Sequence, residues 1–187
     1  SQDPSALEKS ERTWLEAGSK QADGAYALVQ MTRPRSLAAG LNDSPVGLAS
    51  WIVDRFHSWC DFERELDEVV SKDDLLTNIM LYWVTQTIGS SAYGYYADAQ
   101  SPSLTPKDRV ERPVALALSP KEIGGVPPRS LADRTLAVQR WTELPRGGHF
   151  TALEQPELYA RDVIEFSREL TRPQLNRQEA RHVARIL

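Results

Sequence analysis

Two short apolar segments have the character of β-strands, and they set the fold class. Val114–Leu118 is an uninterrupted apolar run after Pro113, typical of a strand buried on both faces of a parallel sheet. Ala137–Thr142 is the second candidate, and a short helix is expected near residues 130–135 between them. A strand, a helix and a second strand predict one parallel crossover. Because one crossover cannot form a complete layered sheet, the chain is predicted to hold only the edge of an α/β domain.

Capping signals predict a helical first half. Helices are expected over residues 6–22, from Ser44 onward and from Ser71 to about Tyr95, because each start carries a serine that can accept from free backbone donors of the first turn. Residues 25–35 are expected to form a loop. The expected buried face of the second helix consists of Val46, Ala49, Ile52, Val53 and Phe56.

Composition excludes several classes of protein. The 22 Lys and Arg residues are mixed along the chain with 26 Asp and Glu, and the net charge of −4 argues against nucleic-acid binding. The longest apolar runs are far shorter than the roughly 18 residues of a membrane span. The single cysteine, Cys60, excludes an internal disulfide and a cysteine-based zinc site, so we expect no metal and a reducing, cytoplasmic location.

His149 is the strongest candidate for chemistry. It follows Gly147-Gly148 after the second predicted strand, and the final helix is expected to start shortly afterwards, at Pro156. The carboxyl edge of a parallel sheet is where such folds place their ligand crevices. His57 and His182 have no such setting, and we interpret both as structural or surface residues.

A carboxylate on the loop after the first strand could orient this histidine. Glu122 lies there, where it could bond the second ring nitrogen and stabilise the imidazolium, as the third member of a catalytic triad does. Position alone leaves Glu111, Glu143 and Asp133 as alternatives.

Five segments spread along the chain carry more specific patterns. They are Asn42–Ala49, Asp73–Asn78, Leu81–Trp83, Arg146–Phe150 and Leu153–Leu158. The first three resemble the lid, and the last two the catalytic-histidine segment, of the microsomal, juvenile-hormone and bacterial type of epoxide hydrolase. The resemblance implies a partial α/β-hydrolase fold, with an all-helical lid at residues 1–103 and the last strands and helices of the parallel sheet at residues 104–187.

The resemblance also implies roles for individual residues. His149 matches the general base that activates water, and Glu122 matches its acid partner. Tyr26 and Tyr95 match two lid tyrosines that donate hydrogen bonds to the epoxide oxygen, with Tyr93 and then Tyr96 as alternatives to Tyr95. In this family an aspartate opens the epoxide to form an ester, and the water activated by the histidine hydrolyses the ester to a vicinal diol, with no metal or cofactor.

The family's nucleophile is missing from this pattern. None of the aspartates lies on a glycine-flanked strand–turn–helix, and the chain begins where the family's lid begins, so the sequence predicts a partial chain that is inactive by itself. An epoxide, water and an N-terminal half of the same enzyme are the expected partners. The alternatives are another α/β-hydrolase, such as a dehalogenase or an esterase, and a non-catalytic remnant or interaction module.

Overall fold

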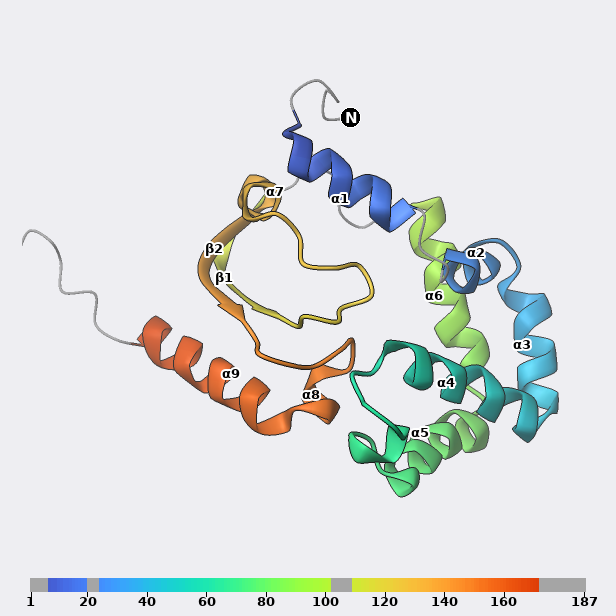
Figure 1. Cartoon of the computed structure of the whole chain (residues 1–187). Coiled ribbons are helices and arrows are strands. Elements are labelled where there is room, and N and C mark those ends of the chain that lie inside the picture. The colour runs from blue at the N-terminus through green and yellow to red at the C-terminus, as the bar shows by residue number, and fades with distance from the viewer. Residues whose placement is uncertain (1–6, 20–23, 102–108, 172–187) are drawn as a thin grey trace, which may run out of the picture.

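The structure is a computed structural model that describes residues 7–19, 24–101 and 109–171, and it places a helical half beside a small parallel sheet (Figure 1). The helical half consists of α1 (Lys9–Ser19), α2 (Gly24–Thr32), α3 (Pro34–Asp43), α4 (Pro45–Trp59), the 3-10 helix η2 (Leu66–Glu68), α5 (Lys72–Thr85) and α6 (Ile88–Gln100). The sheet half consists of β1 (Val110–Leu118), α7 (Arg129–Thr135), β2 (Leu136–Glu143), α8 (Thr151–Glu154) and α9 (Pro156–Thr171). The domain boundary expected between residues 103 and 104 lies outside the described residues.

The two strands pair in parallel, as the sequence predicted, and both are longer than expected. The register runs from Val110 opposite Leu136 to Leu118 opposite Glu143. A register irregularity lies between Val110 and Pro113, where the proline cannot donate a backbone hydrogen bond. The carboxyl ends of both strands, and the loops that follow them, point toward the helical half (Figure 1).

Helix α9 packs against the sheet, as expected, but through charged groups. Its buried residue is Asp162, which accepts hydrogen bonds from Arg140 Nε at 2.7 Å and from the Thr142 hydroxyl at 2.6 Å. Arg140 also pairs with Glu165 and Glu169. The sequence places Leu158, Val163, Ile164, Phe166 and Leu170 on one apolar stripe of this helix, which predicts a buried face. The prediction is partly wrong, because Val163, Ile164 and Leu170 are exposed.

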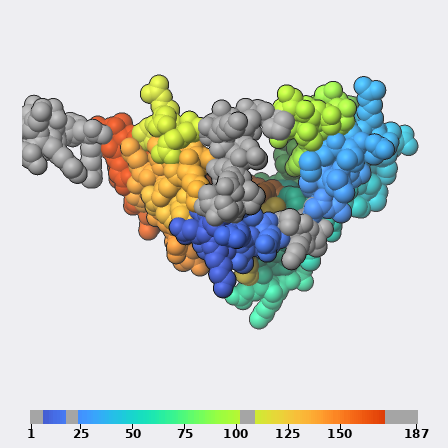
Figure 2. All heavy atoms as spheres, turned by 90° about the horizontal axis from the view of Figure 1, so that it is seen from above, coloured from blue at the N-terminus to red at the C-terminus, as the bar shows by residue number. Residues whose placement is uncertain are grey.

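Helices α3 to α6 share one apolar core, α2 packs on α6 and α3, and we call α2 to α6 the lid. Helix α6 packs on α2 and α3, and α4 packs on α3 and α5. The side chains buried at its centre are Leu41, Leu48, Ile52, Phe56, Val70, Leu75, Ile79 and Ile88. Figure 2 shows the lid (light blue to green) and the sheet half (yellow to red) as two masses, with α1 (dark blue) at their junction.

Helix α1 is tied to the sheet half. Glu11 is buried and pairs with Arg134 of α7 at 3.0 Å, and Trp14 Nε1 donates to the Gly125 carbonyl at 3.3 Å. The ends of the helix expected over residues 6–22 lie outside the described residues.

Two of the predicted helix starts are confirmed by their caps. The Gly47 amide donates to Ser44 Oγ at 3.0 Å, with Pro45 in the first turn of α4. The Asp74 amide donates to Ser71 Oγ at 3.1 Å at the start of α5. Within the described residues, no helix is both long and apolar enough to cross a membrane.

The expected loop over residues 25–35 is wrong. Residues 24–32 form α2, and Pro34 begins α3, where the first turn needs no backbone donor from it. Helix α2 is short and packs against α6, so tertiary contact rather than a capping signal accounts for it.

Two further expectations about helices are corrected. The helix expected from Ser71 to Tyr95 ends at Thr85, because Gln86 takes a left-handed conformation with φ of 55° and α6 starts afresh at Ile88. The buried face of α4 is also shifted: Val46 is 73% exposed, whereas Leu48 is completely buried. The buried positions follow a helical spacing set by Leu48, Ile52, Phe56 and Trp59.

Replacing Leu48 with alanine should destabilise the lid strongly. The side chain is 0% exposed, so its loss leaves a cavity, and we expect the free energy of unfolding to fall by about 2–5 kcal/mol. Denaturant unfolding measures this change. The matched control is Leu76→Ala on α5, which removes the same atoms from a side chain that is 57% exposed and should change stability by about 0.5 kcal/mol or less. Equal losses for the two variants would contradict the position of the core.

Candidate active site

The histidine loop after β2 is tightly folded, and glycines permit its shape. Gly147 has a φ of 120°, a conformation that residues with a Cβ rarely adopt. A Cβ on Gly148 would overlap the carbonyl oxygen of Trp59 at the end of α4. The His149 amide donates to this same carbonyl oxygen at 2.9 Å. The loop therefore holds His149 directly against the lid.

The His149 ring is hydrogen-bonded to Glu122, as its position in the sequence predicted. The distance from His149 Nδ1 to Glu122 Oε1 is 2.7 Å, and the two side chains are 37% and 35% exposed. Glu122 lies in a turn in which the Gly125 amide donates to the Glu122 carbonyl at 2.8 Å. With a carboxylate at Nδ1, the neutral ring keeps its proton there, which leaves Nε2 able to accept one.

The other candidate acids have partners elsewhere. Glu111 pairs with Arg109 at 3.2 Å, and Asp133 pairs with Arg129 at 3.0 Å. Glu143 accepts from Trp141 Nε1 at 3.5 Å. Of the four candidates, the structure brings Glu122 alone to His149.

A cavity of about 250 Å³ lies between the lid and the histidine loop. Tyr26 and Tyr95 line it together with His149, so the residues that the resemblance selected meet in one space. The rings of Tyr26 and Tyr95 lie edge to face with centroids 6.2 Å apart. Burial, and next the neighbouring Tyr95 hydroxyl, raise the pKa of Tyr26, so its hydroxyl remains a proton donor at neutral pH.

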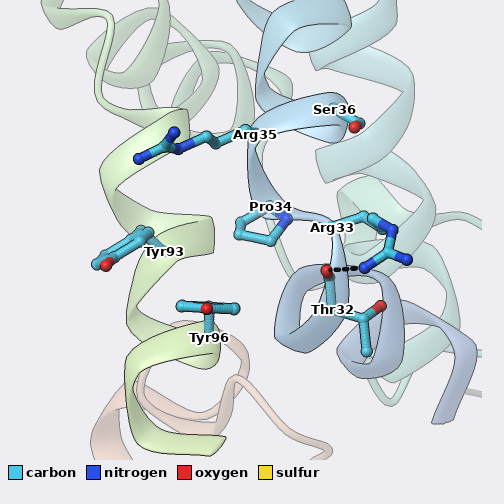
Figure 3. A pocket seen from close by; sticks show the side chains of 7 residues that line it. All are labelled: Thr32, Arg33, Pro34, Arg35, Ser36, Tyr93 and Tyr96. Atoms are coloured by element: carbon cyan, nitrogen blue, oxygen red, sulfur yellow. Dashed lines mark hydrogen bonds between the residues drawn. The ribbon is translucent and has the colours of Figure 1, made fainter. Parts of the chain in front are cut away.

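Tyr93 and Tyr96, the alternatives to Tyr95, lie away from this cavity. Their rings are 5.4 Å apart and line a separate hollow of about 390 Å³. Figure 3 shows both on one face of α6, opposite the α2–α3 junction with Arg33, Pro34 and Arg35. Positions three apart share a helix face, whereas Tyr95 points elsewhere. Of the remaining histidines, His57 contacts the Phe62 ring, and His182 lies outside the described residues.

The known proteins that this chain resembles include epoxide hydrolases. A putative epoxide hydrolase of Stigmatella aurantiaca is 39% identical over 145 residues, which cover 78% of this chain and 32% of that protein. Epoxide hydrolase 1 of Oryctolagus cuniculus is 37% identical, over 77% of this chain and 34% of its own length. The crystal structure of juvenile hormone epoxide hydrolase from the silkworm Bombyx mori matches 84% of this chain and 38% of its own chain, with a TM-score of 0.72 and 29% identity. No family model matches the chain.

This chain is related to epoxide hydrolases of the α/β-hydrolase fold. It spans about a third of the length of the curated relatives that it matches. The recognised resemblance and the partial α/β-hydrolase fold are thereby confirmed, with the helical lid and the parallel strand pair as the parts described.

Several residues of this site were not singled out in the sequence. Gln30, Trp51 and Arg55 line the cavity, and Trp51 stacks on the Tyr26 ring at 4.8 Å. The Arg55 guanidinium lies 5.2 Å from the centroid of the Tyr26 ring. Helical spacing from Trp51 to Arg55 and Trp59 was the available signal, but a stripe of tryptophans is also typical of plain core.

Among the described residues, no three His, Cys, Asp or Glu side chains are grouped so that they could hold a metal ion.

The Cys60 thiol should be unreactive in the folded chain. Burial first, and next the neighbouring Glu154 carboxylate, raise the pKa of Cys60 to about 12. An ordinary thiol has a pKa near 8.5, so the thiolate fraction at pH 8 should be about a thousandfold lower than in the unfolded chain. Reaction with a chromogenic disulfide at pH 8, with and without urea, measures the ratio. Equal rates would show that the junction beside Cys60 is open.

The ionisation of Asp61, next to this cysteine, should make the stability of the chain depend on pH. The ion pair with Lys121 and the Gly147 amide hold the pKa of Asp61 below its ordinary value, which is about 3.9 in unfolded chains. The stabilisation is present at pH values above the pKa of Asp61 in the unfolded chain. It is lost as the pH falls through the lower pKa of Asp61 in the folded chain. Asp61→Asn should therefore lower the denaturation midpoint at pH 7 and lower it less toward pH 3. The control is Asp43→Asn, which changes an exposed carboxylate. Its effect on the denaturation midpoint should not become smaller toward pH 3.

Proposed function

We propose that this chain supplies the lid, the tyrosine donors and the general base for the hydrolysis of an epoxide to a vicinal diol. The observation that carries the proposal is the single cavity lined by Tyr26, Tyr95 and the Glu122-bonded His149. Ring opening needs donors for a developing alkoxide, and ester hydrolysis needs a base for water. One cavity offers both sets of groups.

The nucleophile in this proposal is an aspartate from the part of the relatives that this chain does not span. Its carboxylate oxygen attacks one ring carbon, the C–O bond of the epoxide breaks, and Tyr26 or Tyr95 protonates the alkoxide. The products of this step are a hydroxyalkyl ester and a tyrosinate. The hydroxyl groups donate where negative charge develops, which is worth more in a cavity that excludes water than in solution.

His149 acts in the second step of the proposal. Its Nε2 takes a proton from water, and the resulting hydroxide adds to the ester carbonyl. The acyl–oxygen bond then breaks, the leaving alkoxide takes the proton of the newly formed carboxylic acid, and the diol leaves with the aspartate carboxylate restored. The proton on the imidazolium, which Glu122 stabilises, returns to the tyrosinate to complete the cycle.

The cavity walls favour a substrate with an apolar substituent. Aromatic side chains from both halves enclose the space, and Phe56 and Phe150 stack across the junction with centroids 4.2 Å apart. Trp59 meets the His149 ring edge to face at 5.1 Å. We infer that the aryl or alkyl substituent of an epoxide packs against these rings, because burial of apolar surface there is favourable.

A chimera tests the proposed roles. The remainder of the Stigmatella relative, joined to this chain in place of the region that it matches, should hydrate an aryl epoxide. His149→Gln should stop turnover after ring opening, so the protein should gain the mass of one epoxide as a stable ester, with kcat lower by several powers of ten. Mass spectrometry of the intact protein measures the ester. Loss of activity without any ester would remove His149 from the second step.

The tyrosine roles are separated by a matched pair of variants. Tyr95→Phe should slow ester formation by about 10²–10³-fold, as removal of one oxyanion donor does. Tyr93→Phe makes the same change two residues away, outside the cavity, and should leave the rate unchanged.

The 187-residue chain alone should form no diol. Diol formation by the chain alone that is lost on His149→Ala would show that it contains its own nucleophile.

A further inference from the structure

Glu154 is a buried carboxylate that does not line the cavity. It ends the short helix α8 and is 6% exposed. Its Oε2 accepts from the Asp61 amide at 2.6 Å and from the Gly148 amide at 2.8 Å, and its Oε1 accepts from the Phe150 amide at 2.8 Å. Three backbone donors from two separate segments therefore converge on one side chain.

These donors surround the candidate base. Gly148 and Phe150 are the two neighbours of His149, so Glu154 fixes the backbone on both sides of the imidazole. The His149 amide itself donates to the Trp59 carbonyl at 2.9 Å. All three consecutive amides of the histidine loop are thus held by buried acceptors, and the loop has little freedom to turn the ring.

The third donor connects this loop to the segment that carries Glu122. The Asp61 carboxylate accepts from the Gly147 amide at 2.9 Å and pairs with Lys121 Nζ at 2.5 Å. The Lys121 amide donates to the Gly147 carbonyl at 3.2 Å. Lys121 directly precedes Glu122, so residues 59–61 at the end of α4 are tied to the loops of both members of the pair.

We propose that Glu154 is a positioning residue for the His149–Glu122 pair, which it aligns by binding the Gly148 and Phe150 amides and the Asp61 amide at the end of the lid. The inference rests on the proposed function for its catalytic meaning. What Glu154 is proposed to fix is the conformation of the histidine loop, and this conformation can be measured without any substrate.

A glutamine at position 154 is a near-isosteric test of this role. A carboxylate presents two acceptor oxygens, whereas an amide presents one oxygen and one NH₂ group. In Glu154→Gln, the NH₂ group must therefore face a backbone N–H, either that of Phe150 or those of Asp61 and Gly148. The loop should shift. The hydrogen bond between His149 Nδ1 and Glu122 should then be lost, or should form in only some of the positions that the ring takes.

The first measurement is the ring tautomer of His149 in the 187-residue chain, read at pH 8 from ¹H–¹⁵N spectra and assigned by the signal lost in His149→Gln. The unmodified chain should show a single tautomer with the proton on Nδ1. Glu154→Gln should show a mixture of the two tautomers. Glu157→Gln, the same chemical change at an exposed glutamate three residues further on, should keep the single tautomer.

A second comparison separates positioning from stability. Leu48→Ala opens a cavity near the start of α4, whereas the histidine loop bonds to Trp59 at the end of that helix, so this variant should keep the Nδ1 tautomer in the folded chain. A mixture in Leu48→Ala as large as that in Glu154→Gln would overturn the proposal, because general loosening would then explain both. A single Nδ1 tautomer in Glu154→Gln would overturn it as well.

A third measurement needs no variant, so it holds even if Glu154→Gln does not fold. The Asp61, Gly148 and Phe150 amides of the unmodified chain should exchange with solvent at least tenfold more slowly than unbonded loop amides, since each donates to a charged acceptor. Exchange as fast as in a free loop would overturn the proposal. These readouts involve no epoxide, so failure of the chimera to form a diol would refute the proposed function and leave the positioning role standing.

Discussion

The parallel pairing of β1 with β2 determines where the histidine and its carboxylate partner can lie. Leu118 and Glu143 stand opposite each other at the strand ends, and the Leu144 amide still donates to the Leu118 carbonyl at 2.8 Å. The loops that leave the two strands are therefore neighbours. Glu122 and His149 lie 27 residues apart in sequence and 2.7 Å apart in space for this reason. An antiparallel pair would have sent the two loops to opposite ends of the sheet.

The lid meets this edge with aromatic side chains that serve as both core and cavity wall. The Tyr26 ring stacks on Trp51 and lies edge to face with Trp59, at centroid distances of 4.8 and 5.2 Å. Such contacts hold the ring in place while its hydroxyl remains in the cavity. Trp51 and Trp59 are therefore not core residues alone, because both line the cavity as well.

The features that could be predicted from sequence depend on local patterns. The apolar run after Pro113, the glycines before His149 and the capping serines each act within a few residues, and the structure has strands, a turn and helix starts there. The features that could not be predicted depend on distant contacts. Helix α2 forms against α6, and α9 turns Asp162 inward because Arg140 lies on the facing strand. Periodicity alone offered no way to anticipate a charged helix face at the sheet.

The end of α4 is joined by backbone hydrogen bonds to the loop that carries the base. The Trp59 carbonyl accepts from the His149 amide, and the Asp61 amide donates to the same carboxylate that binds Gly148 and Phe150. A swing of α4 that widened the entrance to the cavity would draw these acceptors away from the loop. The entrance could then not be open while the imidazole is aligned. A ligand would enter while the imidazole is misaligned, and the imidazole could act as a base only after the entrance has closed.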